Sequence, residues 1–307
     1  MFETAIILIN YNSSEHTINC VNSIIEKTSP ELNYQIIITD NASEEEDYLK
    51  LKSFTETLKG INLELHRNRI NTGFGGGNMF GVQFANARYL VFVNNDTLFL
   101  NDCLSILKSE MEKNPQIGIA GAQSFKENGD FMVSLDHYAS PAREIFGRNF
   151  LEKINSEKYP KRKKRYSNPV KVNFVPGSLM FMKADDFYEV GGFDTNIFLY
   201  YEETDLCLRL AEKSKYAYLI PQAKFIHLHG ASTEKSIAIK KELKISLLYI
   251  IRKHYGYFAH QTVSSFLLIK YFFSSIFKSK NRPLFFLILR GAPLSESLKT
   301  KQKIKHL

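Results

Sequence analysis

The chain has 307 residues, 44% hydrophobic and 23% charged, a globular composition that excludes a disordered or fibrous protein. Its three scattered cysteines, Cys20, Cys103 and Cys207, cannot form a disulfide framework or a zinc cluster, which favours a reducing compartment. The net charge of +8 is uneven: residues 235–307 hold 15 Lys/Arg and two Asp/Glu, a balance of +13, and residues 1–234 carry −5. We therefore expect an anionic partner for the C-terminal segment.

Over the first 122 residues, short apolar strands alternate with amphipathic helices. A glycine-rich loop at 71–78 is expected to open a helix that ends near Ala87. Such alternation predicts βαβ units and a mostly parallel sheet. Strands are predicted at 5–9, 34–39, 61–66, 89–93 and 117–122, and helices at 14–27, 44–58 and 102–113.

The remainder is less regular. Residues 123–171 mix turns and charge, and the basic run 161–165 is expected to be an exposed loop. From about Ile237 onward the chain is predicted to be helical and basic. The segment 254–269 is too short and too polar to span a membrane, which takes about 20 apolar residues. Further strands are predicted at 172–182, 216–220 and 224–227, and helices at 184–190 and 204–213.

Three of the predicted strands end in polar residues, at 10–12, 40–41 and 94–97. Ligands of open α/β sheets bind at the carboxyl ends of the strands, so these groups are candidates for one site. Asp96 could hold a divalent cation that bridges phosphate oxygens, and Asp40 could accept hydrogen bonds from a nucleobase or ribose. Either residue alone could instead form a turn. The glycine-rich loop could approach an anion, although it is not the dinucleotide fingerprint.

Two further clusters carry chemistry. Glu202, Glu203 and Asp205 lie at a predicted helix start, where they could simply favour the helix dipole or could include a general base. His227 and His229 fall on one side of a short strand, and either could ligate a metal or be structural.

Together these motifs resemble family 2 glycosyltransferases of the rhamnosyltransferase-like branch, which act on cell-surface polysaccharides. The match covers roughly residues 4–256. It rests on the runs 7–12, 38–43, 71–78, 91–97, 176–182, 191–194, 201–209 and 227–232.

The resemblance implies an α/β GT-A fold and an inverting, Mg²⁺- or Mn²⁺-dependent transfer from a nucleoside-diphosphate-sugar to a glycan or lipid-linked saccharide. Residues 1–234 would be the catalytic domain, with a nucleotide-sugar half at 1–122 and an acceptor half at 123–234. Asp96 and His227, the latter chosen over His229, would hold the metal. Donor-binding residues would be Asn10, Tyr11, Asp40, Asn41, Asn71, Gly73, Phe74, Asn78, Asn94 and Asn95; acceptor-side residues would be Gly177, Ser178, Gly192, Phe193 and Asp194.

The chain departs from the family pattern at two places. The Asp-x-Asp metal motif is reduced to Asp96 alone, within Asn94-Asn95-Asp96. The usual Glu-Asp pair is Glu202-Glu203, which puts the catalytic base at Glu203 and leaves Glu202 or Asp205 as alternatives. A non-catalytic glycan-binding or scaffold protein is therefore a second hypothesis. A sugar nucleotidyltransferase is a third, but a basic glycine-rich loop is missing after the first strand.

In residues 235–307, phenylalanine and tyrosine interleave with Lys and Arg. This helical extension is predicted either to bind an anionic membrane surface or to pack on the catalytic domain or a second subunit. Nucleic acid is not expected, since no recognised binding motif accompanies the charge. The sequence thus predicts a cytoplasmic protein, held at the inner face of the cell membrane if the extension binds lipid.

Overall fold

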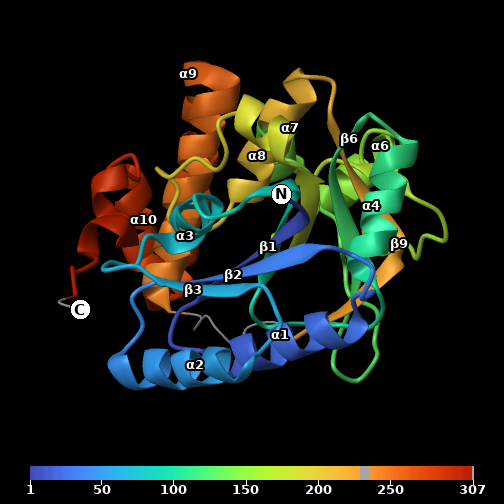
Figure 1. Cartoon of the computed structure of the whole chain (residues 1–307). Coiled ribbons are helices and arrows are strands. Elements are labelled where there is room, and N and C mark those ends of the chain that lie inside the picture. The colour runs from blue at the N-terminus through green and yellow to red at the C-terminus, as the bar shows by residue number, and fades with distance from the viewer. Residues whose placement is uncertain (229–235, 306–307) are drawn as a thin grey trace.

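The computed structural model describes residues 1–228 and 236–305, and its centre is a nine-stranded sheet with helices on both faces (Figure 1). In chain order its helices and strands are β1 (Phe2–Asn10), α1 (Ser14–Lys27), β2 (Tyr34–Asp40), α2 (Glu45–Thr57), β3 (Leu63–Arg67), α3 (Gly73–Val82), β4 (Ala87–Asn94), β5 (Thr97–Phe99), α4 (Cys103–Lys113), β6 (Ile117–Phe125), α5 (Pro141–Phe146), α6 (Arg148–Ile154), β7 (Val170–Val172), β8 (Leu179–Lys183), α7 (Ala184–Glu189), α8 (Glu202–Glu212), β9 (Tyr216–His227), α9 (Ile237–Phe277) and α10 (Arg282–Leu289).

The strand order is β3-β2-β1-β4-β8-β6-β9-β5, and β7 also pairs with β9. Pairing is parallel through β3-β2-β1-β4 and again between β6 and β9, whereas β8 runs antiparallel to both of its neighbours. The α/β fold with its central sheet is therefore confirmed. The parallel strands end at one edge, which brings the polar strand ends of β1, β2 and β4 together.

Two buried apolar clusters lie on the two faces of the sheet. The first packs α1, α2 and α4 against residues such as Ile6 and Ile38, and the second packs α3, α7 and α8 against residues such as Ile7 and Phe92. Successive residues of β1 point to opposite faces, so a run that is apolar throughout supplies both clusters. The predicted continuous apolar strands are explained by this burial on both faces.

The glycine-rich segment is a helix and not a loop, and the helix ends at Val82 and not near Ala87. A side chain at Gly77 would lie 3.0 Å from Ile9, and one at Gly81 would lie 2.7 Å from Ile7. The glycines therefore let α3 pack directly on β1. The sequence prediction was wrong here because glycine lowers helix propensity, whereas close packing on the sheet offsets that cost.

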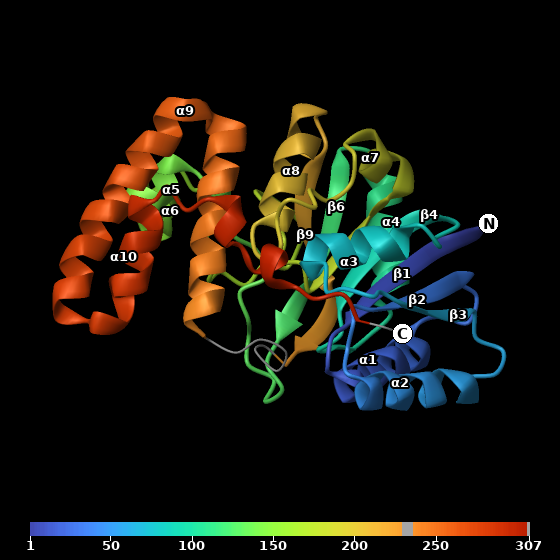
Figure 2. The ribbon, with the colours of Figure 1, turned by 90° about the vertical axis from the view of Figure 1, so that its left-hand side faces the viewer.

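The C-terminal segment forms a helical layer beside the sheet (Figure 2). Helix α9 turns at Gly256, which has φ of 81°, and its second half packs on α10 as a hairpin. A third apolar cluster, which includes Ile250, Val263 and Leu287, joins these helices to each other and to Ile197. No helix in the described ranges is long and apolar enough to cross a membrane. The predicted domain boundary at residue 234 lies outside the described residues.

Candidate functional site

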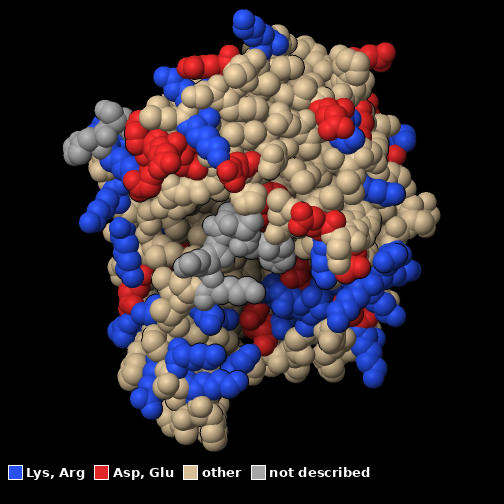
Figure 3. All heavy atoms as spheres, turned by 90° about the horizontal axis from the view of Figure 1, so that it is seen from below, with Lys and Arg blue, Asp and Glu red and all other residues tan. Residues whose placement is uncertain are grey.

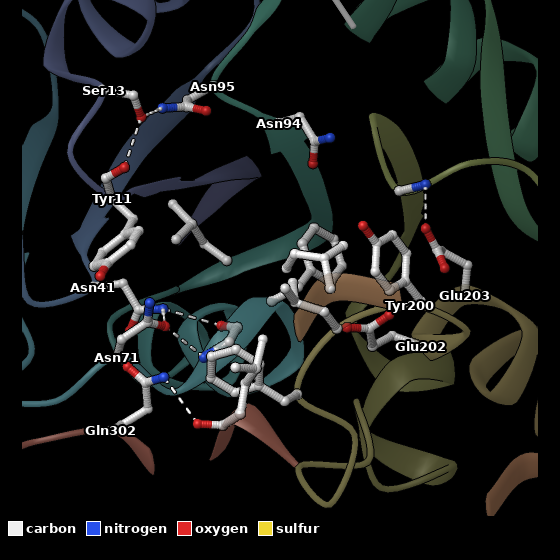
Figure 4. A pocket seen from close by; sticks show the side chains of 18 of the residues that line it. Tyr11, Ser13, Asn41, Asn71, Asn94, Asn95, Tyr200, Glu202, Glu203 and Gln302 are labelled. Atoms are coloured by element: carbon white, nitrogen blue, oxygen red, sulfur yellow. Dashed lines mark hydrogen bonds between the residues drawn. The ribbon is translucent and has the colours of Figure 1, made fainter. Parts of the chain in front are cut away.

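A cavity of about 490 Å³ lies at the polar edge of the sheet (Figure 4). Tyr11, Asn41, Asn71 and Gln302 line one side of it, and Tyr200, Glu202 and Glu203 line the other. Among the donor-site residues predicted from sequence, the lining includes Tyr11, Asn41, Asn71, Gly73, Phe74, Asn94 and Asn95. The strand ends and the 71–78 run thus meet at one cavity.

Asn41 organises one wall of this cavity. Its side-chain amide donates to Asn71 Oδ1 at 3.0 Å and to the Gly73 carbonyl at 3.1 Å, and its carbonyl oxygen accepts from the Thr72 amide at 3.1 Å. One side chain at the end of β2 therefore fixes the chain that enters α3. On the other side of the sheet end, Asn95 donates to Ser13 Oγ at 2.7 Å.

Asp40 and Asn10 are fully buried and do not line the cavity. Asn10 donates to Asp40 Oδ1 at 3.0 Å and to Asp47 at 2.8 Å, and the Asp40 carboxylate also lies 3.4 Å from Arg67 Nε. Asn78 is also buried, and donates to the Phe74 carbonyl at 3.1 Å. These three residues support the site from beneath, and a ligand could reach Asp40 only if its surroundings moved.

The start of α3 already has partners for two of its amides. Gly73 N–H donates to Asn71 Oδ1 at 2.9 Å, and Phe74 N–H donates to the Phe198 carbonyl at 3.0 Å. A side chain at Gly73, whose φ is +75°, would lie 2.0 Å from that carbonyl. Asn71 therefore occupies one of these two amides and the segment before α8 occupies the other, so neither is open to a phosphate in this arrangement.

The two predicted metal ligands are adjacent. Thr97 of β5 pairs with His227 of β9, and this register places His227 Nε2 3.1 Å from Asp96 Oδ1. Asp96 is 3% exposed and directly follows Asn95 of the cavity wall. Within the described ranges, no group of three or more His, Cys, Asp or Glu side chains could hold a metal ion. His229, the alternative ligand, lies outside the described residues.

Glu202 and Glu203 both face the cavity from the first turn of α8. Glu203 Oε1 accepts from the Gly177 amide at 2.9 Å, and any side chain at Gly177 would lie 2.7 Å from that oxygen. Glu202 Oε1 is buried and accepts no hydrogen bond from the residues that the structure describes. Burial and then the charge of Glu203 raise the pKa of Glu202 well above its usual range, and burial raises the pKa of Glu203.

Asp205 has a different environment, although it lies on the same turn. It is 0% exposed and does not line the cavity. Its carboxylate lies 2.6 Å from Arg209, 2.6 Å from Lys253 and 2.8 Å from His254. Burial opposes its ionisation, but these three partners outweigh that effect and lower its pKa to about 2. Such a carboxylate has no free oxygen for a substrate, so only Glu202 and Glu203 remain as candidate bases.

The predicted acceptor-side residues support the cavity floor and the C-terminal layer. Gly177 lines the cavity, whereas the Ser178 carbonyl accepts from the Asn94 amide at 3.1 Å. Gly192 has φ of +68°, and Phe193 packs edge-on against Phe74 with ring centroids 5.7 Å apart. Asp194 lies 2.7 Å from Lys253 of α9.

Ten of the lining residues were not predicted from the sequence. Four of them lie within two residues of a predicted site residue: Ile9, Ser13, Val93 and Tyr200. The remaining six lie further away. Phe198 and Leu199 belong to the segment before α8, which continues into Tyr200 and Tyr201, both with φ of 73°. Two consecutive left-handed tyrosines are unusual and mark a turn that the tertiary structure imposes. The only sequence signal was the aromatic pair before the acids. The other four lining residues come from the C-terminal segment: Ser236, Ile239, Leu298 and Gln302.

The C-terminal residues are held in place by a buried carboxylate. Glu242 of α9 is 1% exposed, and it accepts from Ser297 Oγ and from the Leu298 amide, each at 2.8 Å. Further along, the Lys305 amide donates to the Arg69 carbonyl at 2.6 Å. The segment between these anchors includes Gln302, so the end of the described chain forms part of the cavity wall.

Comparison with known proteins agrees with this geometry. Residues 5–191 match the model of Glycosyl transferase family 2. The chain is 28% identical over 229 residues to Rhamnosyltransferase WbbL of Escherichia coli K12, covering 72% of this chain and 83% of that one. It is also 28% identical over 88 residues, 28% of this chain and 29% of the relative, to N-acetylglucosaminyl-diphospho-decaprenol L-rhamnosyltransferase of Mycobacterium tuberculosis. The family resemblance read from the sequence is thus confirmed.

Solved structures show the same fold. The mannosyltransferase PcManGT from Pyrobaculum calidifontis, in complex with GDP-Man and Mn²⁺, aligns with a TM-score of 0.60 at 14% identity, covering 96% of this chain and 87% of that one. GalNAc-T7 with UDP, GalNAc and Mn²⁺ aligns with a TM-score of 0.60 at 13% identity, covering 83% and 49%. At these identities the likeness concerns the fold alone, and it confirms GT-A.

Proposed function

Since this chain belongs to glycosyl transferase family 2, we propose that it moves a sugar from a nucleoside-diphosphate-sugar to a hydroxyl of a cell-surface glycan or lipid-linked saccharide, with inversion. The chain is a glycosyltransferase by family, and the sugar, acceptor and stereochemistry are the proposal. The observation that carries it is one cavity between amide-rich strand ends and two carboxylates. A hexosyl group, and rhamnosyl in particular, is favoured by the names of the relatives.

The donor would occupy the side of the cavity that Tyr11, Asn41 and Asn71 line. The Tyr11 ring is 44% exposed at the mouth, where it could stack on a base. Asn94 and Asn95 would lie nearer the diphosphate, beside Asp96. The buried pair Asn10–Asp40 would act through these residues, since it has no surface in the cavity.

Asp96 and His227 fit a divalent cation. A carboxylate oxygen and an imidazole nitrogen 3.1 Å apart are suitable ligands for Mn²⁺, and diphosphate oxygens could complete the shell. A bound cation would stabilise the negative charge that the leaving diphosphate acquires. With a single carboxylate in place of the usual two, we expect weaker metal affinity than an Asp-x-Asp site would give.

Glu203 is the proposed general base. Its Oε1 is fixed by the Gly177 amide, while its other oxygen remains for the acceptor hydroxyl. That hydroxyl gives its proton to Glu203 as its oxygen forms a bond to the anomeric carbon. The carbon–oxygen bond to the diphosphate breaks on the opposite face, and the electron pair leaves with the diphosphate. Burial and the charge of Glu203 raise the pKa of Glu202, which favours its protonated form, and a protonated carboxyl can donate a hydrogen bond to a sugar hydroxyl.

Residues 235–307 are proposed to hold this site near its acceptor, with the protein at the inner face of the cell membrane. The supporting observation is that the +13 segment also forms part of the cavity wall. A lipid-linked acceptor, which the name of the mycobacterial relative includes, would then meet the cavity at the membrane surface.

The test is a thermal-shift screen of the full chain against nucleoside diphosphates and their sugars, with Mn²⁺, Mg²⁺ or EDTA. A ligand at 100 times its Kd stabilises the native state by about 2.7 kcal/mol, so one nucleotide should raise the Tm in a metal-dependent way. The stabilising nucleotide-sugar should then be consumed when acceptor extract is added. If no nucleotide stabilises the chain and no nucleotide-sugar is consumed, the proposal fails in favour of a non-catalytic protein.

A further inference from the structure

The hairpin, defined as residues 257–290, exposes apolar side chains on its outer surface. Phe277 is 84% exposed and Phe258 is 85% exposed, and the aromatic rings of Phe272 and Phe285 are in contact, with centroids 5.8 Å apart. The other exposed apolar residues of the hairpin are Tyr257, Ile269, Phe272, Phe273, Ile276, Phe286 and Leu289. An apolar surface of this extent on a folded chain marks a contact with a partner or a membrane.

The inner surface of the hairpin is also apolar. Val263, Leu267 and Leu287 are buried in the cluster that joins α9 and α10. A helix that is apolar on both its inner and outer sides does not fit a water-exposed position. The exposed apolar residues of the hairpin, here called the outer row, therefore take the place of the polar face that a water-exposed helix would have. No helix of the described ranges is long and apolar enough to cross a bilayer.

The charges around this row are all of one sign. Residues 257–290 contain five Lys/Arg and no Asp/Glu. Lys270, Lys278, Lys280 and Arg282 are exposed around the tip, and the fifth, Arg290, pairs with Glu296 at 2.8 Å. In the view from below, Figure 3 shows more Lys and Arg than Asp and Glu in the lower half of the picture.

A second copy of the chain fits this surface poorly. In a two-fold contact the same patch meets itself, which would place these lysines opposite lysines. An anionic bilayer instead supplies an apolar layer for the aromatic residues and negative headgroups for the basic ones. The charge pattern therefore favours lipid over self-association.

We propose that the hairpin is the membrane-docking element of this protein, and that it inserts its outer aromatic row into the interface of an anionic bilayer. The start of α9, where Ser236 and Ile239 line the cavity, lies on the same lower side as the hairpin tip in Figure 2. Docking through the tip thus brings the cavity towards the bilayer. This inference rests on the membrane attachment proposed for residues 235–307, but not on the assignment of Glu203 or of the donor.

The test is flotation of the full chain with vesicles of phosphatidylcholine alone or with 30% phosphatidylglycerol. The wild-type chain should float with the anionic vesicles, and 0.5 M NaCl should weaken this binding. Phe277→Ser should reduce the bound fraction about tenfold or more, since the phenylalanine that would insert into the bilayer is lost. Tyr188→Ser is its matched control, because Tyr188 is 51% exposed on α7, away from the hairpin, and should leave binding unchanged.

A second pair of variants tests the charge. Lys278→Glu combined with Lys280→Glu should abolish flotation with anionic vesicles. Lys113→Glu combined with Lys213→Glu makes the same change in net charge on α4 and after α8, and should retain flotation. Light scattering of the free protein tests the alternative that a second copy of the chain covers the hairpin. Three results would each overturn the proposal, whatever the outcome of the nucleotide screen. They are no flotation of the wild-type chain, an equal loss of flotation in both double lysine variants, and a dimer that Phe277→Ser dissociates.

Discussion

Residues 1–228, here called the body, and the C-terminal segment place their charged and apolar residues in opposite ways. The body hides its apolar residues on the two faces of a sheet and gathers acids at the edge of that sheet. The segment buries one apolar row, leaves another exposed, and carries +13. They nevertheless share the cavity, because Leu298 and Gln302 line it beside Asn41. A segment that composition alone marks as an appendage thus also forms part of the cavity wall.

The joint between the two regions is an ion-pair network. Lys253 and His254 of α9 both lie within 2.8 Å of Asp205 of α8, and Lys253 also pairs with Asp194. Three residues earlier, Glu202 has no such partner and a raised pKa. The acids of one helical turn are therefore divided: those facing the cavity are kept available, and the one facing the segment is neutralised to hold the two regions together.

The largest effect is expected on the transfer rate, from a substitution in the body. Glu203→Gln should lower the transfer rate by about 10²–10⁴-fold, because the proton acceptor is lost. Since the raised pKa of Glu202 favours its protonated form, which glutamine resembles, Glu202→Gln should have a much smaller effect. Transfer kinetics of both variants, with folding checked by circular dichroism, measure this. If Glu202→Gln were the more severe change, the base assignment would be reversed.

The next largest effect is expected on stability, from a substitution in the ion-pair network that joins α8 to α9. Asp205→Asn should lower the free energy of unfolding by about 3 kcal/mol, because it leaves buried cationic partners uncompensated. Its pKa is lowered in the fold, to about 2, so the stability it contributes is complete above the unfolded value of about 3.9 and is lost as the pH falls towards 2.

Urea unfolding at pH 7 and pH 2.5 measures this difference. The variant should differ from wild type strongly at pH 7 and little at pH 2.5. Asp130→Asn is the control, because Asp130 is exposed and its contact with Lys126 is 3.6 Å. An equal loss at both pH values would contradict the network.

A smaller effect is expected at the proposed metal ligands. Asp96→Asn should raise the Mn²⁺ concentration that half-saturates nucleotide binding by about tenfold or more, since the only carboxylate ligand is lost. Titration calorimetry with the nucleotide found in the screen measures this. Asp102→Asn is unsuitable as a control because Asp102 caps α4, so Asp130→Asn serves again. An unchanged metal requirement would remove Asp96 from the site.

The smallest effect tests whether the segment belongs to the donor site. Gln302→Ala should weaken nucleotide binding by about 2–10-fold, because the variant would lose one hydrogen bond to the nucleotide. Lys303→Ala is matched in position, and its side chain is exposed outside the cavity. If both variants bind the nucleotide like wild type, the end of the chain lies beside the donor site without contributing to it, and the two regions of the chain are functionally separate.

Much of the fold followed from local pattern. The apolar strands and amphipathic helices up to α4 were predicted to within a few residues, since period and turn residues are local signals. The short strand β5 was not predicted. The glycine-rich helix was the other exception, because only the proximity of Ile7 and Ile9 explains why glycine is needed there. Similarly, β7 and β8 were predicted as one strand, and the two predicted strands of β9 form one continuous strand.

The sequence by itself determined the family, the polar strand ends and the acids in the first turn of α8. The reason is that the family motifs are contiguous runs whose residue types carry the chemistry. Tertiary structure alone decided how those groups are used. It buried Asp40 and Asn10 beneath the cavity, paired Asp205 with α9, and brought Gln302 to Asn71 across more than two-thirds of the chain. Such contacts depend on how separate elements pack, and no local pattern records that packing.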